Sequence, residues 1–248
     1  MSLFARLRPV LLWTSIFIAS GSGQAVAQDA DRGSSGLFGF GEEAAARFDD
    51  ARIARGREIA TGGAVAGGVD MKCMACHGLK GEGTGIVPGL AGLPYDYLYA
   101  QLAAYIGGER VNDVMAPIAA RLAEAEKTAV LAYYASLPRP EGKPPADLDW
   151  QLARSGELLA YAGRRAPDGR DVTACVMCHE GIGDLAEIAI APPLEGQPAA
   201  YIEAQLTAWK AGKRSGSPLG VMERIADAMT DAEIAAVAAF YASRTPSD

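Results

Sequence analysis

Apolar side chains recur at helical spacing along most of this chain, and the pattern predicts an all-α fold. The first helical segment covers residues 42–60. Two later segments place their apolar residues on one helical face: Tyr97, Leu98, Leu102 and Tyr105 in the first, and Tyr201, Ile202, Leu206 and Trp209 in the second. Gly56 interrupts the first segment, where a glycine costs about 1 kcal/mol in an exposed helix. We therefore expect Gly56 to lie at a close contact with another helix.

The same order of segments occurs twice, with a period of about 100 residues. The matching positions are Gly56 with Gly156, Pro88 with Pro192, Tyr97 with Tyr201, Arg110 with Arg214, Met115 with Met222, and Tyr134 with Tyr241. The offset between partners grows along the chain, and the extra residues fall in loops, where insertions cost little. The pattern indicates that one helical domain has been duplicated.

A proline-rich stretch separates the two copies. Four prolines lie within residues 137–145 and predict a stiff, extended linker. We expect a first domain over residues 42–137, a linker over residues 138–149 and a second domain over residues 150–245. Before them, residues 28–41 are rich in Gly, Ser and Asp and are expected to form a flexible extension.

The first 27 residues have the pattern of a secretory signal peptide. Arg6 and Arg8 supply its charged start, residues 9–20 its apolar middle, and residues 25–27 an A-x-A cleavage site. The apolar run is shorter than the roughly 20 residues that span a bilayer, although an uncleaved anchor stays an alternative. The sequence therefore predicts export, which in a bacterium means the periplasm.

The charge of the chain excludes one class of partner. Its formal net charge is −7, from 23 Lys and Arg against 30 Asp and Glu, and the basic residues are scattered. A nucleic-acid-binding surface needs basic residues gathered on one face, so we expect no nucleic-acid partner.

The candidate chemistry lies in two pentads, residues 73–77 and 175–179, that share the pattern C-x-x-C-H. Together they contain every cysteine and histidine of the chain: Cys73, Cys76, His77, Cys175, Cys178 and His179. C-x-x-C-H is typical of covalent attachment of c-type haem, in which two thiols add to the porphyrin vinyl groups and the histidine binds the iron. The sequence predicts two covalently attached haem c groups.

Other uses of paired cysteines fit the pattern less well. A zinc site of four thiolates leaves the histidine after each pair unexplained. Disulfides between such close cysteines would form strained rings. A thioredoxin-like pair normally occurs once, after a strand, and no strand is expected before either pentad.

Methionine is the expected ligand on the opposite side of each iron, because both histidines are already used and thioether sulfur favours the ferrous ion. In the first half, Met71 and Met74 lie too near the cysteines to reach the far side of the haem, so Met115 is the only candidate. The proline that follows Met115 indicates a loop. In the second half Met222 is favoured over Met229, since the repeat aligns Met229 with Leu122, a core position.

Four further residues are candidates for holding the haem. Each imidazole should donate its second N–H to a backbone carbonyl, and Pro88 and Pro192 lie where a rigid loop would pass that edge of the haem. Arg110 and Arg214 are candidates for pairing with haem propionates, with a solvated loop end as the alternative.

These residues together resemble the dihaem cytochrome c4 family, with a class I cytochrome c fold in each half. The matching stretches are residues 76–78, 88–92, 97–110 and 115–137. The second half departs from the family pattern at Glu180, where the family tends to have glycine, and in a longer loop before Met222. The resemblance implies two tandem class I cytochrome c domains and a periplasmic electron carrier, often loosely associated with the membrane, that passes electrons toward terminal oxidases.

We therefore expect a dihaem electron carrier and not an enzyme, because two filled axial positions leave no open site on the iron. Its expected partners are an electron donor, such as a quinol-oxidising complex or a dehydrogenase, and an acceptor such as a terminal oxidase. Two alternatives stay open. One is a cytochrome subunit of a membrane-bound dehydrogenase complex, and the other is a dihaem enzyme such as a peroxidase or a thiosulfate-oxidising cytochrome.

Overall fold

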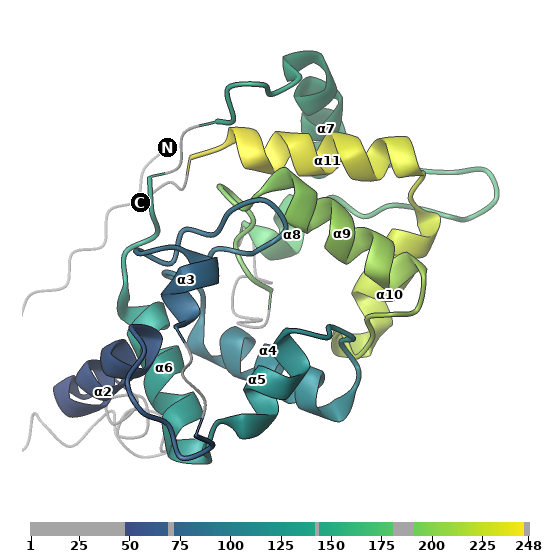
Figure 1. The fold of residues 1–248 in the computed structure, drawn as a ribbon. Helices are drawn as coiled ribbons and strands as arrows, with labels where there is room; N and C mark the ends of the chain where they lie inside the picture. Colours follow the sequence, from purple (N-terminus) through teal and green to yellow (C-terminus); the bar gives the residue numbers. More distant parts are fainter. Residues whose placement is uncertain (1–47, 69–71, 142–143, 181–190, 246–248) are drawn as a thin grey trace, which may run out of the picture. The chain divides into compact units, whose positions relative to one another are not determined.

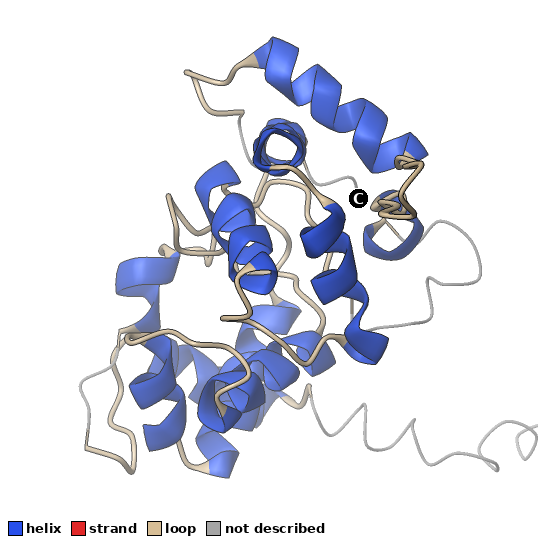
Figure 2. Cartoon of the chain, turned by 90° about the vertical axis from the view of Figure 1, so that its right-hand side faces the viewer, coloured by secondary structure: helices blue, strands red, loops and turns tan. Residues whose placement is uncertain are grey.

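The computed structural model describes residues 48–68, 72–141, 144–180 and 191–245. Contacts divide the chain into two units, Met1–Gly41 and Glu42–Asp248, and all the described residues belong to the second. The expected signal peptide and flexible extension therefore lie outside the described residues. Where the structure is described, it consists of helices and loops with three isolated β-bridges (Figure 2). The predicted all-α fold is confirmed.

The helices follow the same order in the two halves (Figure 1). In the first half they are α2 (Asp50–Ala60), α3 (Cys73–His77), α4 (Tyr95–Gly107), α5 (Met115–Arg121) and α6 (Glu124–Ser136). In the second half they are α7 (Trp150–Ala162), α8 (Val176–His179), α9 (Ala199–Lys210), the short 3₁₀ turn η2 (Pro218–Gly220), α10 (Val221–Ala228) and α11 (Asp231–Ser243). The turn η2 has no counterpart in the first half and accounts for the longer loop before Met222.

Helix α2 begins later than the sequence pattern predicts. The prediction covers residues 42–60, whereas Phe48 and Asp49 are not helical and the helix starts at Asp50. The Asp49 carboxylate accepts a hydrogen bond from the backbone N–H of Arg52 at 2.9 Å and so caps the helix. This side chain satisfies an N–H group that the first turn leaves without a partner, and it fixes the start of the helix.

In each half, the first helix crosses the last one at the centre. Helix α2 packs on α6, and α7 packs on α11. A Cβ atom on Gly56 would lie 2.0 Å from the carbonyl oxygen of Ala129, and one on Gly156 would lie 2.0 Å from that of Ala236. The predicted close contact at Gly56 is therefore confirmed, and the second half repeats it.

Each half has a hydrophobic core of its own. The buried residues of one cluster run from Ile59 to Tyr134, and those of the other run from Leu159 to Tyr241. Aromatic residues of the middle helices, Tyr97 in α4 and Tyr201 in α9, belong to different clusters. The duplication seen in the sequence thus produces two separately packed bodies.

Direct contacts join these two bodies. The backbone N–H of Val111 donates to the carbonyl of Lys213 at 3.0 Å, and that of Ser215 donates to the carbonyl of Glu109 at 2.7 Å. In the proline-rich stretch, Arg139 donates to the backbone carbonyl and the carboxylate of Glu195, at 2.7 and 3.0 Å. The halves are therefore in contact, and the linker is not their only connection.

Candidate haem-binding sites

Both pentads lie on short helices that place the cysteines on the first turn. Helix α3 begins at Cys73 and ends at His77, and Cys175 precedes the first residue of α8. None of the four cysteines forms a disulfide, and their exposure ranges from partly buried to exposed at Cys76. Burial raises the pKa of Cys175 to about 11 and also raises the pKa of Cys73. All four thiols are thus available for thioether bonds.

Each histidine is oriented by a backbone carbonyl. His77 Nδ1 lies 2.9 Å from the carbonyl oxygen of Pro88, and His179 Nδ1 lies 2.7 Å from that of Pro192. A carbonyl only accepts hydrogen bonds, so Nδ1 carries the proton and Nε2 keeps its lone pair. Burial lowers the pKa of both histidines, which favours the neutral imidazole that binds a metal.

The two candidate methionines occupy equivalent positions at the starts of short helices. Met115 is the first residue of α5 and Met222 is the second residue of α10. The prediction that Met115 lies in a loop is therefore wrong, because Pro117 falls in the first turn of a helix, where its missing N–H costs nothing. Met229 is 2% exposed and packs in the core of the second half, as the repeat predicts.

Two polar residues near these methionines were missed in the sequence. Asn112 Oδ1 accepts from the backbone N–H of Met115 at 2.8 Å, and Ser217 Oγ accepts from that of Met222 at 3.0 Å. Asn and Ser are typical residues for this local hydrogen bond, and their position a few residues before each methionine was the available signal. In both halves a side chain of the preceding loop thus fixes the methionine backbone.

The two arginines do not lie at solvated loop ends. Arg110 and Arg214 are each 6% exposed, so that alternative is wrong. Their guanidinium groups lie where the two halves meet, and their hydrogen bonds go to glutamine and tyrosine side chains. Burial is the main cause of the lowered pKa of both histidines, and Arg110 lowers that of His77 and Arg214 that of His179 by a smaller amount. The carbonyls of Pro88 and Pro192, and the Glu195 carboxylate at His179, act in the opposite direction. Each positive charge is thus felt at the histidine of its own half.

Several buried polar atoms match a haem group. The hydroxyl groups of Tyr134 and Tyr241 and the indole N–H of Trp209 have no hydrogen-bond partner among the described residues. The two tyrosines are equivalent in the repeat, and burial raises the pKa of both, with a smaller contribution from Cys73 and Cys175 respectively. A porphyrin offers vinyl groups to the thiols, iron to the imidazoles and carboxylates to such donors. The residues present therefore fit a haem in each half.

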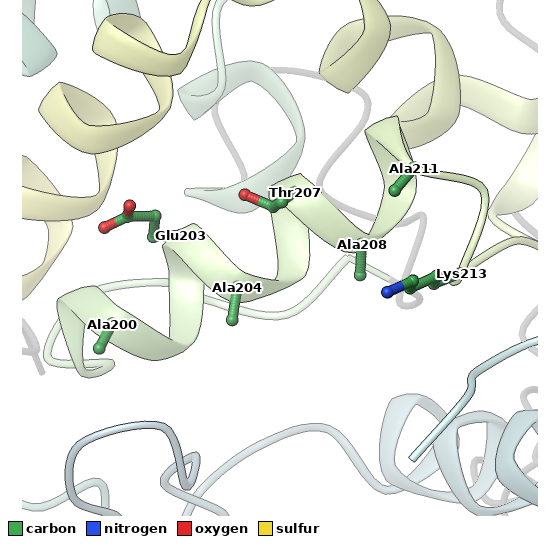
Figure 3. A pocket seen from close by; sticks show the side chains of 7 residues that line it. All are labelled: Ala200, Glu203, Ala204, Thr207, Ala208, Ala211 and Lys213. Atoms are coloured by element: carbon green, nitrogen blue, oxygen red, sulfur yellow. The ribbon is translucent and has the colours of Figure 1, made fainter.

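A pocket on α9 lacks the residue types that bind haem. Figure 3 shows a pocket lined by one face of α9 and by two residues after its end: Ala200, Glu203, Ala204, Thr207, Ala208, Ala211 and Lys213. It contains no cysteine, histidine or methionine. Over the described ranges, no group of three or more His, Cys, Asp and Glu side chains is placed to hold a metal ion. The zinc alternative would require such a group.

The fold and these sites define a class of protein. Two helical bodies, each with a C-x-x-C-H helix and a histidine held by a proline carbonyl, form a dihaem c-type cytochrome. The cytochrome c family model matches the chain twice, over residues 53–138 and 168–244, and the chain belongs to this family. It carries two covalently bound haem c groups and is an electron carrier.

The relatives include thiosulfate dehydrogenase electron acceptors and cytochromes c4. The chain is 44% identical to a thiosulfate dehydrogenase electron acceptor of Thiomonas intermedia, over 69% of this chain and 78% of the relative. It is 36% identical to cytochrome c4 of Thiocapsa roseopersicina, over 68% of this chain and 84% of the relative.

Two solved structures repeat this division. Thiosulfate dehydrogenase TsdBA of Marichromatium purpuratum matches with a TM-score of 0.67 and 38% identity, over 77% of this chain and 40% of the TsdBA chain. Reduced cytochrome c4 of Pseudomonas stutzeri matches with a TM-score of 0.63 and 26% identity, over 77% of this chain and 98% of that chain. This chain therefore covers less than half of the enzyme chain and nearly all of the cytochrome c4.

Proposed function

We propose that this chain accepts electrons from a thiosulfate dehydrogenase and passes them one at a time toward a respiratory acceptor such as a terminal oxidase. The observation that carries this proposal is the 44% identity to an electron acceptor of thiosulfate dehydrogenase, which extends over 78% of that relative. A second such acceptor, from Stutzerimonas stutzeri, is 37% identical over 88% of its length. The similarity to one part of TsdBA supports the same donor.

The proposal assigns the same roles to matching residues in the two halves. We assign covalent attachment to the cysteines and one axial position on each iron to the histidine. We assign the other axial position to methionine. The assignments are Cys73, Cys76, His77 and Met115 in the first half, and Cys175, Cys178, His179 and Met222 in the second. When bound, each haem supplies one reversible one-electron change at its iron.

The surrounding residues orient these ligands. The carbonyls of Pro88 and Pro192 hold each imidazole in the tautomer that leaves Nε2 for the iron. Asn112 and Ser217 hold the backbone of each methionine. Arg110 and Arg214 supply positive charge for the haem carboxylates at the contact between the halves. This arrangement lets an electron enter through one half and leave through the other.

The proposed location is the periplasm. The pattern of residues 1–27 is that of an export signal, and covalent haem attachment in bacteria takes place outside the cytoplasmic membrane. Among the helices of the described residues, none has the length and apolar character needed to cross a bilayer. We propose peripheral association with the membrane through the redox partners.

A reduction experiment tests the proposed donor. The oxidised dihaem protein is mixed with a thiosulfate dehydrogenase and thiosulfate, and the haem absorption is followed by stopped flow. We expect both haems to become reduced, and only when enzyme and thiosulfate are both present. Omission of the enzyme and omission of thiosulfate are the two controls. Oxidised haems after prolonged incubation with the complete system would contradict the proposal.

Cytochrome c4 relatives favour a second candidate donor, a quinol-oxidising respiratory complex. The same stopped-flow measurement with that complex and a quinol separates the two donors by their rates. Gel filtration of the native extract addresses the remaining alternative, a subunit of a larger dehydrogenase complex. A free carrier elutes near the size of a monomer or dimer, whereas a subunit elutes with its dehydrogenase.

A further inference from the structure

Two buried arginines meet where the halves join. Arg110 and Arg214 form an isolated antiparallel β-bridge with each other, and each is 6% exposed. They occupy equivalent positions in the two copies of the domain. A residue that contacts its own repeat equivalent lies close to a local twofold axis. The two guanidinium groups therefore lie near the axis that relates the halves.

The contacts of the guanidinium groups cross between the halves in a reciprocal pattern. Arg110 donates to Gln101 of its own half at 3.0 Å and to Gln205 of the other half at 2.7 Å. Arg214 donates to Gln205 of its own half at 3.0 Å and to Gln101 of the other half at 2.7 Å. Each glutamine thus accepts from both arginines, and neither charge belongs to one half alone.

No carboxylate neutralises these charges among the residues that the structure describes, since neither arginine forms an ion pair there. Arg110 lies over the ring of Tyr105, with 4.6 Å from Cζ to the ring centroid, and Arg214 lies over the ring of Trp209 at 3.8 Å. Aromatic faces and amide oxygens offset only part of the cost of burying two like charges. Such a pair is stabilised most by anions placed close to both guanidinium groups.

Both arginines affect the pKa values of the tyrosines where the halves meet. Arg110 donates to the Tyr201 hydroxyl at 2.9 Å. Burial by itself would raise the pKa of Tyr201, but the charges of Arg110 and Arg214 and the hydrogen bonds outweigh burial and lower it. Burial raises the pKa of Tyr97, in the first half, to about 12, and the charge of Arg214 in the second half opposes that rise. The positive potential of each arginine therefore extends into the other half.

We propose that Arg110 and Arg214 form one shared cationic site that raises the reduction potentials of both haems. The inference rests on the haem positions proposed above and assigns each arginine an effect across the junction. A nearby positive charge stabilises the ferrous state, which carries one electron more, and little solvent screens it at a buried position. Arg110 and Arg214 are positioning residues in this account, because they act through the electrostatic potential and not on the iron directly.

Redox titration of charge-removing variants tests the proposal. In R110Q, the reduced-to-oxidised ratio at a fixed ambient potential should fall by roughly tenfold at the haem of His77. It should also fall, by a smaller measurable factor, at the haem of His179. R214Q should give the mirror image. Haem-methyl signals in proton NMR assign each change to its haem.

Three further variants complete the design. R110M removes the same charge and fills the space with an unbranched apolar chain. It replaces R110Q in the titration if R110Q loses its haems. R110K keeps the charge and should restore most of both potentials. R154Q removes a charge whose side chain is 80% exposed and should shift neither potential.

The titration uses chemical mediators and no dehydrogenase, so its outcome is independent of the identity of the electron donor. A change confined to one haem in both R110Q and R214Q would overturn the shared site. Unchanged potentials at both haems in a variant that still carries two haems, counted by pyridine haemochrome, would overturn it equally.

Discussion

The two halves hold their histidines in the same way but continue differently after them. In the first half Gly78 follows His77 with φ = 89°, and a Cβ atom there would lie 2.4 Å from the Glu82 carboxylate. In the second half Glu180 follows His179 with φ = −111°, and its carboxylate lies 3.6 Å from Arg244. The positions proposed to hold the haem are thus duplicated, while the residue that follows each histidine differs between the halves.

A second difference concerns the way each half supports the other. The Gln197 side chain accepts from the backbone N–H of Gly89 and donates to its carbonyl, both at 3.0 Å. Gly89 follows Pro88, whose carbonyl orients His77. The reciprocal contact cannot form. Leu93, the equivalent of Gln197, has no side-chain amide, and Pro193, the equivalent of Gly89, has no backbone N–H. The Gln197–Gly89 contact therefore supports the first haem site from the second half and has no counterpart in the other direction.

The largest expected effect tests the close helix crossing that both halves have. G56A and G156A should each destabilise the protein by about 3 kcal/mol, because the added methyl group would overlap the backbone of the facing helix. Denaturant unfolding followed by circular dichroism measures the loss. S155A, an exposed neighbour of Gly156, is the control and should change stability little. If one half tolerated its alanine, the two helix crossings would not be equivalent.

The next prediction tests the one-sided support. Q197L should cost about 2 kcal/mol, since it leaves the buried N–H and carbonyl of Gly89 without partners. It should also shift the NMR signals of the haem bound by His77 more than those of the other haem. L93A, at the equivalent position of the first half, is the matched control: it removes core packing without affecting a cross-half hydrogen bond. Equal shifts of the NMR signals of both haems in Q197L would contradict the one-sided support of the first haem site.

The smallest expected effect compares two helix starts. Thr230 Oγ1 accepts from the backbone N–H of Glu233 at 3.2 Å and caps α11, whereas Ala123 at the same position before α6 has no side-chain acceptor. Their backbone angles are similar, with φ/ψ of −76°/160° and −64°/158°. T230A should therefore lose about 1 kcal/mol of unfolding free energy and A123S should gain about 0.5 kcal/mol. Thermal denaturation measures both, and no gain in A123S would show that α6 does not need the cap.

The sequence predicted the features that depend on local pattern or on the repeat. The order of the helices and the contact at Gly56 follow from spacing that is visible in the chain. The core position of Met229 followed from the alignment of the two copies.

Features that depend on contacts between distant residues were not predictable. The burial of Arg110 and Arg214 arises because the two halves meet, and the hydrophobic pattern of one half contains no sign of it. The contact of Gln197 with Gly89 joins residues that are far apart in sequence and lack equivalent partners. The helical position of Met115 is a local feature instead, because Asn112 accepts from the backbone N–H of Met115 and Pro117 fits the first turn of a helix.

The central claim is that each half binds its iron through one histidine and one methionine, and the sulfur-to-iron charge-transfer absorption of the oxidised protein tests it most directly. M115A and M222A should each remove about half of this absorption while both haems stay attached, and the double variant should remove all of it. M229L, in the core of the second half, is the control and should leave the absorption intact. Full absorption in M115A or M222A, with two haems still bound, would contradict the account.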